Sequence, residues 1–184
     1  MAKIIVLDRD GVINFDSDQY IKTPDEWVPI PDSLPAIAML KNAGYTVVLA
    51  TNQSGIGRKL FDIETLNRIH LKMIEMLADL GVSLDAIFFC PHTPGDLCEC
   101  RKPKPGLLLQ IADRFASDPT TIISVGDSWR DIQASSAVGA RSVLVRTGNG
   151  LETQANPKLG PGVLIYANLM EFTQSLLQTT HANK

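Results

Sequence analysis

The chain has 184 residues, of which 45% are hydrophobic and 20% charged, and its formal net charge is −3. This length and composition suit one globular domain with a sizeable core. The slight acidity and the scattered charges give no electrostatic reason to bind nucleic acid or an anionic membrane. The apolar runs are too short for membrane spans, and the start, MAKIIVLDRDG, is too short for a signal peptide. We therefore expect a cytoplasmic protein with reduced thiols.

Short apolar runs alternate with amphipathic segments along the chain. Six runs have the character of strands, at residues 3–8, 46–51, 85–90, 121–127, 141–146 and 163–166. Helical patterns lie between or after them, at residues 32–43, 63–80, 106–116, 129–138 and 168–178. Gly44 and Gly81 are typical helix ends, and Asp62 is a typical N-cap. This alternation predicts an α/β fold: one domain, residues 1–184, with a doubly wound, mainly parallel sheet and helices on both faces.

Two details of this fold are further expectations. The predicted strands are continuously apolar rather than alternating, which indicates that the sheet is buried on both faces. The segment 147–162, rich in glycine, proline and asparagine, is predicted to be a flexible, solvated connection.

Polar residues directly follow three of the predicted strands. The first strand leads into residues 8–11 (DRDG), the second into residues 51–55 (TNQSG), and the fourth into residues 126–131 (GDSWRD). Any one acid there is more simply a turn residue or a helix cap. Because ligands bind beyond the carboxyl ends of strands in such sheets, however, the three segments together predict one site. Its carboxylates suit Mg²⁺, and the TNQSG turn offers hydroxyl and N–H donors for a phosphate.

All three cysteines lie in CPHTPGDLCEC, residues 90–100. A disulfide is disfavoured by the reducing compartment and by the odd number of cysteines, while a nucleophilic cysteine beside the histidine, or unligated thiols, remain alternatives. Two ligand pairs at short spacing fit a closed Cys₃His site for structural Zn²⁺ better. The predicted zinc ligands are Cys90, His92, Cys98 and Cys100. Such a zinc loop would fix the backbone just before Arg101 and Lys102.

Four segments occur in the order of the four motifs of the haloacid dehalogenase (HAD) superfamily of phosphotransferases. They are LDRDGVIN (7–14), ATNQSGIG (50–57), CRKPKPG (100–106) and VGDSWRD (125–131). The chain resembles that superfamily over residues 3–146, and in particular the branch that holds heptose bisphosphate phosphatases and histidinol-phosphate phosphatases. The predicted helices and strands fill the intervals between the motifs, so we expect no cap domain.

The resemblance implies roles for individual residues. Asp8 matches a nucleophile that forms an aspartyl-phosphate, and Asp10 a general acid and base. Mg²⁺ would be held by Asp8, the main-chain carbonyl of Asp10, and Asp127. Thr51 and Lys102 would hold and neutralise the phosphoryl group. The expected substrate contacts are Arg9, Asp10, Asp16, Tyr20, Thr51, Asn52, Gln53, Ser54, Arg101 and Lys102.

Three residues keep a second interpretation at this point. Asp131 would orient the Mg²⁺ ligands, or else serve as an ordinary acid at a helix N-terminus. Lys104 competes with Lys102 for the role of the phosphate-binding lysine. The lone helical His70 is expected to be structural or exposed.

The branch implies a Mg²⁺-dependent phosphatase acting on the C7 phosphate of D-glycero-D-manno-heptose 1,7-bisphosphate, in nucleotide-heptose and lipopolysaccharide precursor synthesis. Residues 57–59 (GRK) depart from the Ala-Arg-Gly that heptose enzymes often show. The alternatives are a histidinol-phosphate phosphatase and a non-catalytic, zinc-stabilised phosphosugar-binding module. The expected partner is a small-molecule sugar phosphate, without nucleic acid or membrane, and the protein is expected to be a monomer.

Overall fold

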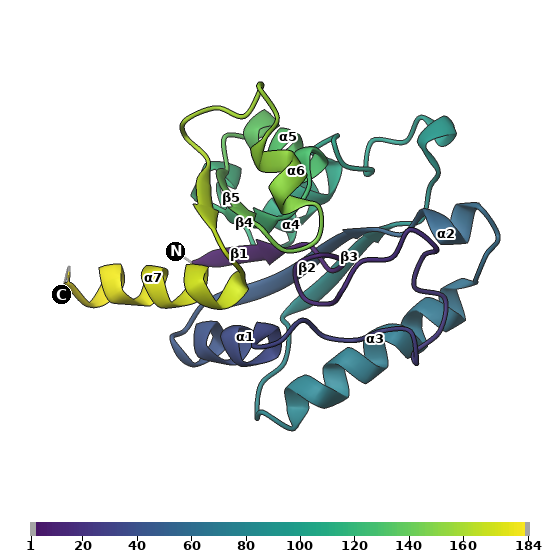
Figure 1. Cartoon of the computed structure of the whole chain (residues 1–184), viewed down its shortest axis with the longest axis horizontal. Coiled ribbons are helices and arrows are strands. Elements are labelled where there is room, and N and C mark those ends of the chain that lie inside the picture. The colour runs from purple at the N-terminus through teal and green to yellow at the C-terminus, as the bar shows by residue number, and fades with distance from the viewer. Residues whose placement is uncertain (1–2, 183–184) are drawn as a thin grey trace.

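Six parallel strands form the central sheet of the computed structural model, which describes residues 3–182 (Figure 1). They are β1 (Ile4–Leu7), β2 (Thr46–Asn52), β3 (Ala86–Cys90), β4 (Ile123–Gly126), β5 (Arg141–Val145) and β6 (Leu164–Tyr166). Every predicted strand is confirmed to within a few residues at its ends. The predicted domain of residues 1–184 includes four terminal residues that lie outside the described part.

The strand order places a crevice at the middle of the sheet. The order is β3-β2-β1-β4-β5-β6, so the chain moves outward from β1 to β3 and then returns to the other side of β1. Leu7 lies beside Leu49 in β2 and Val125 in β4. The loops that follow these three strands therefore leave the sheet at nearly the same level, at the point where ligands bind in doubly wound folds.

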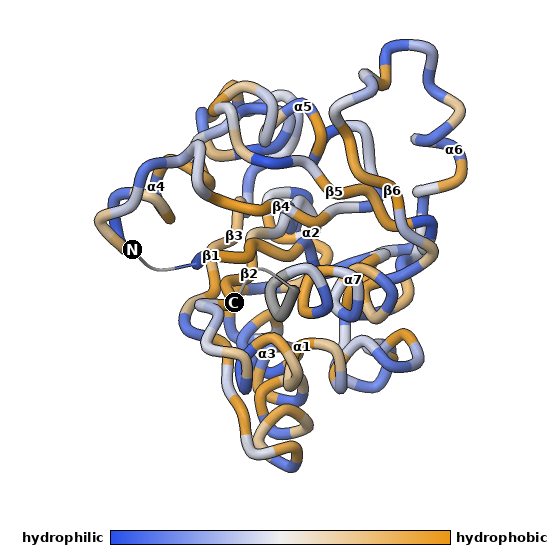
Figure 2. Tube along the Cα trace, turned by 90° about the vertical axis from the view of Figure 1, so that its left-hand side faces the viewer, coloured by the Kyte–Doolittle hydropathy of each residue, from blue (hydrophilic) through white to orange (hydrophobic). Residues whose placement is uncertain are grey.

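Helices cover both faces of the sheet, as predicted (Figure 1). One layer consists of α1 (Ser33–Asn42), α3 (Ile63–Ala78) and α7 (Leu169–Ala182), and the other of α4 (Gly106–Arg114) and α5 (Trp129–Ala137). Ile5 and Leu7 pack into the core under the first layer, while Ile4 and Val6 pack into the core under the second. Both faces of β1 are buried, which explains its continuous apolar sequence. Figure 2 shows these strands as hydrophobic segments in the interior.

Local signals place the helix ends. The carboxylate of Asp62 accepts a hydrogen bond from the backbone N–H of Thr65, so the predicted N-cap of α3 is confirmed. Gly44 and Gly81 have φ values of 83° and 74°, the left-handed conformation in which glycine commonly ends a helix.

Two expectations about the fold were wrong in part. The residues of β3 before Cys90 are only half-buried, because β3 is an edge strand that the helices cover incompletely. The segment 147–162 is not simply a solvated connection, since it contains the short helix α6 (Gly150–Gln154) and bonds back to the ends of other strands. A second short helix, α2 (Ser54–Gly57), follows β2.

Within residues 3–182 the intervals between the motif segments hold only these helices, strands and connecting loops, with no inserted cap domain. None of the helices in this described range has the length and apolar character needed to cross a membrane.

Candidate active site

A polar cavity of about 230 Å³ lies beyond the carboxyl ends of β1, β2 and β4. The predicted Mg²⁺ and substrate residues all line it: Asp8, Arg9, Asp10, Asp16, Tyr20, Thr51, Asn52, Gln53, Ser54, Arg101, Lys102, Asp127 and Asp131. Arg130 and Asn149 also line the cavity and were not predicted. Tertiary structure thus brings the four motif segments to one site, while the individual roles stay predictions.

Three carboxylates crowd together at the bottom of this cavity. Oxygen atoms of Asp8, Asp127 and Asp131 lie within 4.8 Å of one another. Burial, reinforced by the charges of Asp131 and Asp10 against the opposing charge of Lys102, raises the pKa of Asp8 to about 7. Burial and the charges of Asp131 and Asp8 raise the pKa of Asp127 to about 8. The ammonium of Lys102 offsets only part of the negative charge of these three acids, and such a set of buried oxygen ligands fits a hard divalent cation such as Mg²⁺.

Lys102 is the cation beside these buried carboxylates and is 6% exposed. Its ammonium lies 3.0 Å from Asp8 Oδ1 and 2.5 Å from Asp131 Oδ1, and it donates to the carbonyl of Ala50 at 2.8 Å. Burial lowers the pKa of Lys102, but the neighbouring carboxylates of Asp131 and Asp8 outweigh this effect and raise it. The side chain therefore stays charged beside Asp8 over the whole physiological pH range. Lys104, by contrast, is turned outward.

Asp131 caps a helix, as the second of its two interpretations predicts, and it also binds Lys102, while its influence on the Mg²⁺ ligands stays a prediction. Its Oδ2 accepts from the backbone N–H and the hydroxyl of Ser128, at 3.1 and 2.5 Å, and so caps α5. Its Oδ1 holds Lys102. Burial acts to raise the pKa of Asp131, but the ammonium of Lys102 and the bonds from Ser128 hold it below its usual value.

The backbone packs closely around Asp127. A Cβ atom on Gly11 or on Gly148 would lie 2.2 Å from Asp127 Oδ2, and both glycines have positive φ values. Asn149 donates to the same oxygen from its backbone N–H at 2.7 Å and from its side-chain amide at 3.1 Å. The sequence reasoning missed Asn149, although the polar TGNG run after the fifth strand could have indicated it by the same rule as the other strand ends.

Asn52 ties the end of β2 to the third motif. Its side-chain amide donates to the carbonyl of Lys102 at 3.0 Å, and its side-chain oxygen accepts from the N–H of Lys102 at 3.1 Å. The backbone of Lys102 is therefore anchored to the neighbouring strand end. A contact between Asn52 and a phosphate stays a prediction.

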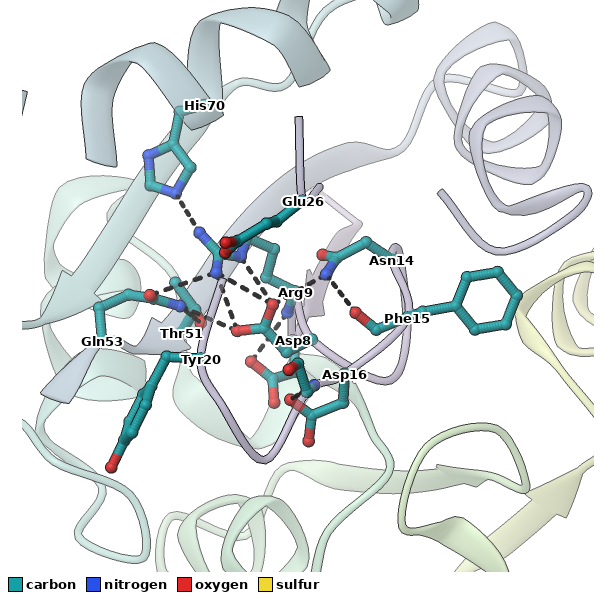
Figure 3. Close-up of polar contacts among 12 residues, drawn as sticks. Asp8, Arg9, Asn14, Phe15, Asp16, Tyr20, Glu26, Thr51, Gln53 and His70 are labelled. Atoms are coloured by element: carbon teal, nitrogen blue, oxygen red, sulfur yellow. Dashed lines mark hydrogen bonds and ion pairs between the residues drawn. The ribbon is translucent and has the colours of Figure 1, made fainter. Parts of the chain in front are cut away.

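Asp10 accepts hydrogen bonds from Arg9, Asn14 and Gln53, whose side chains are labelled in Figure 3. Arg9 donates to both carboxylate oxygens of Asp10 at 3.0 Å, from Nε and Nη2. Asn14 and Gln53 add one amide hydrogen bond each, at 2.9 and 3.0 Å. The other end of the Arg9 guanidinium lies 3.4 Å from Nε2 of His70.

His70 proves to be buried rather than exposed. Burial, assisted by the charge of Arg9, lowers the pKa of His70 to about 4. Its ring is therefore neutral near pH 7 and can accept the hydrogen bond from Arg9. The sequence offered no signal that this helical histidine faces the first motif.

The four predicted zinc ligands converge. Cys90 Sγ lies 3.5 Å from His92 Nδ1, 3.6 Å from Cys98 Sγ and 3.1 Å from Cys100 Sγ. A tetrahedral site with Zn–S bonds of about 2.3 Å requires ligand separations of about 3.8 Å, close to these values. The sulfur–sulfur distances exceed the length of a disulfide bond, and the thiols are free. The ligand set fits Zn²⁺.

The zinc loop lies next to a basic rim of the cavity, which consists of Arg101 and Arg130. The guanidinium of Arg101 donates to the carbonyl of His92 at 3.3 Å. Burial, followed by the nearby charges of Arg130 and Arg58, lowers the pKa of Arg101. Positive charge is thus concentrated on the side of the site near the zinc loop and α5. The guanidinium groups of Arg58, Arg101 and Arg130 are near enough to repel one another.

Comparison with known proteins extends over almost the whole chain. A family profile of HAD-hydrolase-like proteins matches residues 99–171. The D-glycero-β-D-manno-heptose-1,7-bisphosphate 7-phosphatase of Bordetella bronchiseptica is 52% identical over 176 residues, covering 96% of this chain and 98% of the relative. The protein of the same name from Pseudomonas aeruginosa is 50% identical over 175 residues, covering 95% of this chain and 98% of the relative.

Solved structures agree with this similarity. The crystal structure of the D,D-heptose 1,7-bisphosphate phosphatase from B. bronchiseptica, complexed with magnesium and phosphate, matches with a TM-score of 0.94 at 52% identity. The match covers 96% of this chain and 99% of that chain. The D,D-heptose 1,7-bisphosphate phosphatase from Burkholderia thailandensis matches with a TM-score of 0.76 at 47% identity, covering 95% and 98% of the two chains.

Proposed function

This chain belongs to the D-glycero-β-D-manno-heptose-1,7-bisphosphate 7-phosphatase family of HAD-like phosphoric monoester hydrolases, and we propose that it removes the C7 phosphate of that sugar bisphosphate. The observation that carries the proposal is the cavity in which Asp8 lies against Lys102 and two further buried acids. Relatives of nearly the same length, about half identical, bear this activity in their names. We further propose that the reaction supplies nucleotide-heptose and lipopolysaccharide precursors in the cytoplasm, and that the protein acts as a monomer.

Asp8 is the proposed nucleophile. Its Oδ1 accepts from the backbone N–H of Arg9 at 2.8 Å and lies 3.0 Å from the ammonium of Lys102. Among the described residues, no hydrogen bond is found to Oδ2. We assign attack on phosphorus to Oδ2, because the bonds to Oδ1 fix the direction in which the free oxygen points. Mg²⁺, held by Asp8, the main-chain carbonyl of Asp10 and Asp127, would neutralise the phosphoryl oxygens so that the anionic nucleophile can approach.

The remaining residues have the following proposed roles. Asp10 gives a proton to the leaving sugar oxygen and then takes one from the water that hydrolyses the aspartyl-phosphate. Lys102 offsets the negative charge of Asp8 and of the phosphoryl group, and its position is maintained by Asp131. The hydroxyl of Thr51, at the end of β2, donates to a phosphoryl oxygen.

The basic rim fits the second phosphate of the substrate. A bisphosphate that places its C7 group over Asp8 still carries a dianion at C1, which requires a positive partner away from the acids. Arg101 and Arg130 line the cavity and supply that charge. Asp16 and Tyr20, from the loop after β1, are proposed to contact the sugar between the phosphates.

The zinc loop has a mechanical role in this proposal. Zn²⁺ held by the Cys₃His set would fix the backbone one and two residues before Arg101 and Lys102. It would thereby aim one side chain at the substrate and the other at Asp8.

A substrate panel tests the proposed function. Both anomers of D-glycero-D-manno-heptose 1,7-bisphosphate and histidinol phosphate are offered with Mg²⁺, and kcat/KM is measured by phosphate release, with the position of cleavage read by phosphorus NMR. We expect the β-bisphosphate to be hydrolysed fastest and at C7. Faster turnover of histidinol phosphate would replace the proposed substrate by that alternative. Absence of turnover of every phosphomonoester would favour the binding module.

A further inference from the structure

The carboxylate of Asp10 is fully occupied by partners within the protein. A carboxylate offers about four lone-pair sites for hydrogen bonds. Here Arg9 fills two of them, and the amides of Asn14 and Gln53 fill one each. The plane and direction of the Asp10 side chain are therefore set by three neighbouring side chains.

Arg9 and Gln53, both predicted substrate contacts, line the cavity but are hydrogen-bonded to other residues of the protein. The Arg9 side chain is 1% exposed, and its guanidinium binds Asp10, the Gln53 oxygen at 3.2 Å, and His70. Gln53 is 4% exposed, and its amide nitrogen donates to Asp10 and to the hydroxyl of Thr51. The polar atoms of both side chains are hydrogen-bonded to other residues of the site.

His70 holds the far end of Arg9. It extends from α3, and its Nε2 faces Nη1 of Arg9 (Figure 3). The ring packs edge-on against Phe89, with 6.5 Å between the ring centroids. Arg9 is thus clamped between a neutral acceptor on one side and a carboxylate on the other, which removes the freedom of its long side chain.

We propose that Gln53 and the Arg9–His70 pair are positioning residues that aim Asp10 at the leaving oxygen of the phosphate ester. The inference rests on the proposed function, in which Asp10 is the general acid. When Asp10 gives up its proton, negative charge forms on its carboxylate. A protonated carboxyl accepts only about three hydrogen bonds, so one of the two amides, that of Asn14 or that of Gln53, must leave its oxygen while Asp10 carries the proton. As the proton passes to the leaving oxygen, that amide returns to the carboxylate, and the guanidinium of Arg9 already faces the charge that forms. A proton donor displaced by about 1 Å would lose about 100-fold in rate.

The test separates proton transfer from phosphate binding. An alkyl phosphate, such as the sugar bisphosphate, needs a proton on its leaving oxygen, whereas p-nitrophenyl phosphate releases a stabilised anion that does not. We compare kcat/KM for both substrates, since this constant reports the steps up to bond cleavage. The variants are Gln53→Met and His70→Leu, with His70→Gln to restore an acceptor for Arg9. Leu71→Ala, on the exposed next position of α3, is the matched control.

We expect Gln53→Met and His70→Leu to lower kcat/KM for the sugar bisphosphate about 10- to 100-fold and that for p-nitrophenyl phosphate less than about threefold. His70→Gln should recover most of the loss, and Leu71→Ala should change neither substrate. Equal losses for both substrates, or no loss, would overturn the inference. If His70→Leu does not fold, as judged by circular dichroism, Gln53→Met decides the question.

Failure of the proposed function has a different signature. In that case the unaltered protein releases no phosphate from the heptose bisphosphate, whatever the variants do. The comparison of alkyl and aryl leaving groups can then be made with any alkyl phosphate that the unaltered protein hydrolyses.

Discussion

Replacing Asp127 with asparagine would remove one negative charge from the buried group of Asp8, Asp127 and Asp131. Without Mg²⁺, the pKa values of Asp8 and Asp127 in the folded protein rise from 3.8 to about 7 and about 8, chiefly through burial. The folded protein therefore binds more protons than the unfolded chain between about pH 4 and about pH 8, so the free energy of unfolding falls as the pH rises through that window.

The size of the effect follows from the pKa of Asp127. The pKa of Asp127 rises from its ordinary 3.8 to about 8 in the folded protein. At about 1.4 kcal/mol for each pKa unit, ionising Asp127 lowers the free energy of unfolding by at most about 6 kcal/mol. The repulsion is shared with Asp8 and Asp131, and the variant weakens the bonds from Asn149. We therefore expect Asp127→Asn to stabilise the Mg²⁺-free protein by about 2 kcal/mol at about pH 9, and to change it little at about pH 4.

Urea denaturation followed by circular dichroism measures this prediction. The protein is freed of Mg²⁺ by dialysis rather than by a chelator, which would also strip the zinc loop. At neutral pH, Mg²⁺ at about 100 times its dissociation constant should stabilise the unaltered protein by about 3 kcal/mol and Asp127→Asn much less. A Mg²⁺-free stability that rises between about pH 4 and about pH 9, or an equal response of both proteins to Mg²⁺, would refute the reasoning.

Three more variants test the site. Asp8→Asn should abolish turnover while the circular dichroism spectrum stays that of the folded, unaltered protein, and measurable turnover would remove Asp8 as the nucleophile. Cys98→Ser should lower the amount of bound zinc found by metal analysis, and it should lower the melting temperature by about 5–10 °C. The control Leu97→Ala, in the same loop, should change neither quantity. An unchanged melting temperature for Cys98→Ser would contradict a structural zinc. Asn149→Ala should raise the Mg²⁺ concentration for half-maximal activity about tenfold, because an outer hydrogen bond to a metal ligand is lost, and an unchanged requirement would exclude this role.

The element order and the location of the site could be predicted from the sequence, because they depend on local properties. Continuous apolar runs such as residues 4–7 form strands buried in the sheet, and an acid that follows such a run directly must lie at its carboxyl end. In a parallel sheet all those ends meet at one edge, so Asp8, Thr51 and Asp127 had to be close together. The convergence of Cys90, His92, Cys98 and Cys100 was equally predictable, since all four fall within residues 90–100.

Only the tertiary structure decided what the side chains within the site contact. The direction of Arg9 is set by Gln53 and His70, which are 44 and 61 residues away along the chain. Asn149 reaches Asp127 across a separation of 22 residues. Such contacts depend on how separate helices and loops pack onto the sheet, and a single sequence carries no local pattern for them. The same reason explains why β3 is apolar and yet half-exposed: its composition records its propensity to form a strand, while its place at the edge of the sheet is set by the other strands.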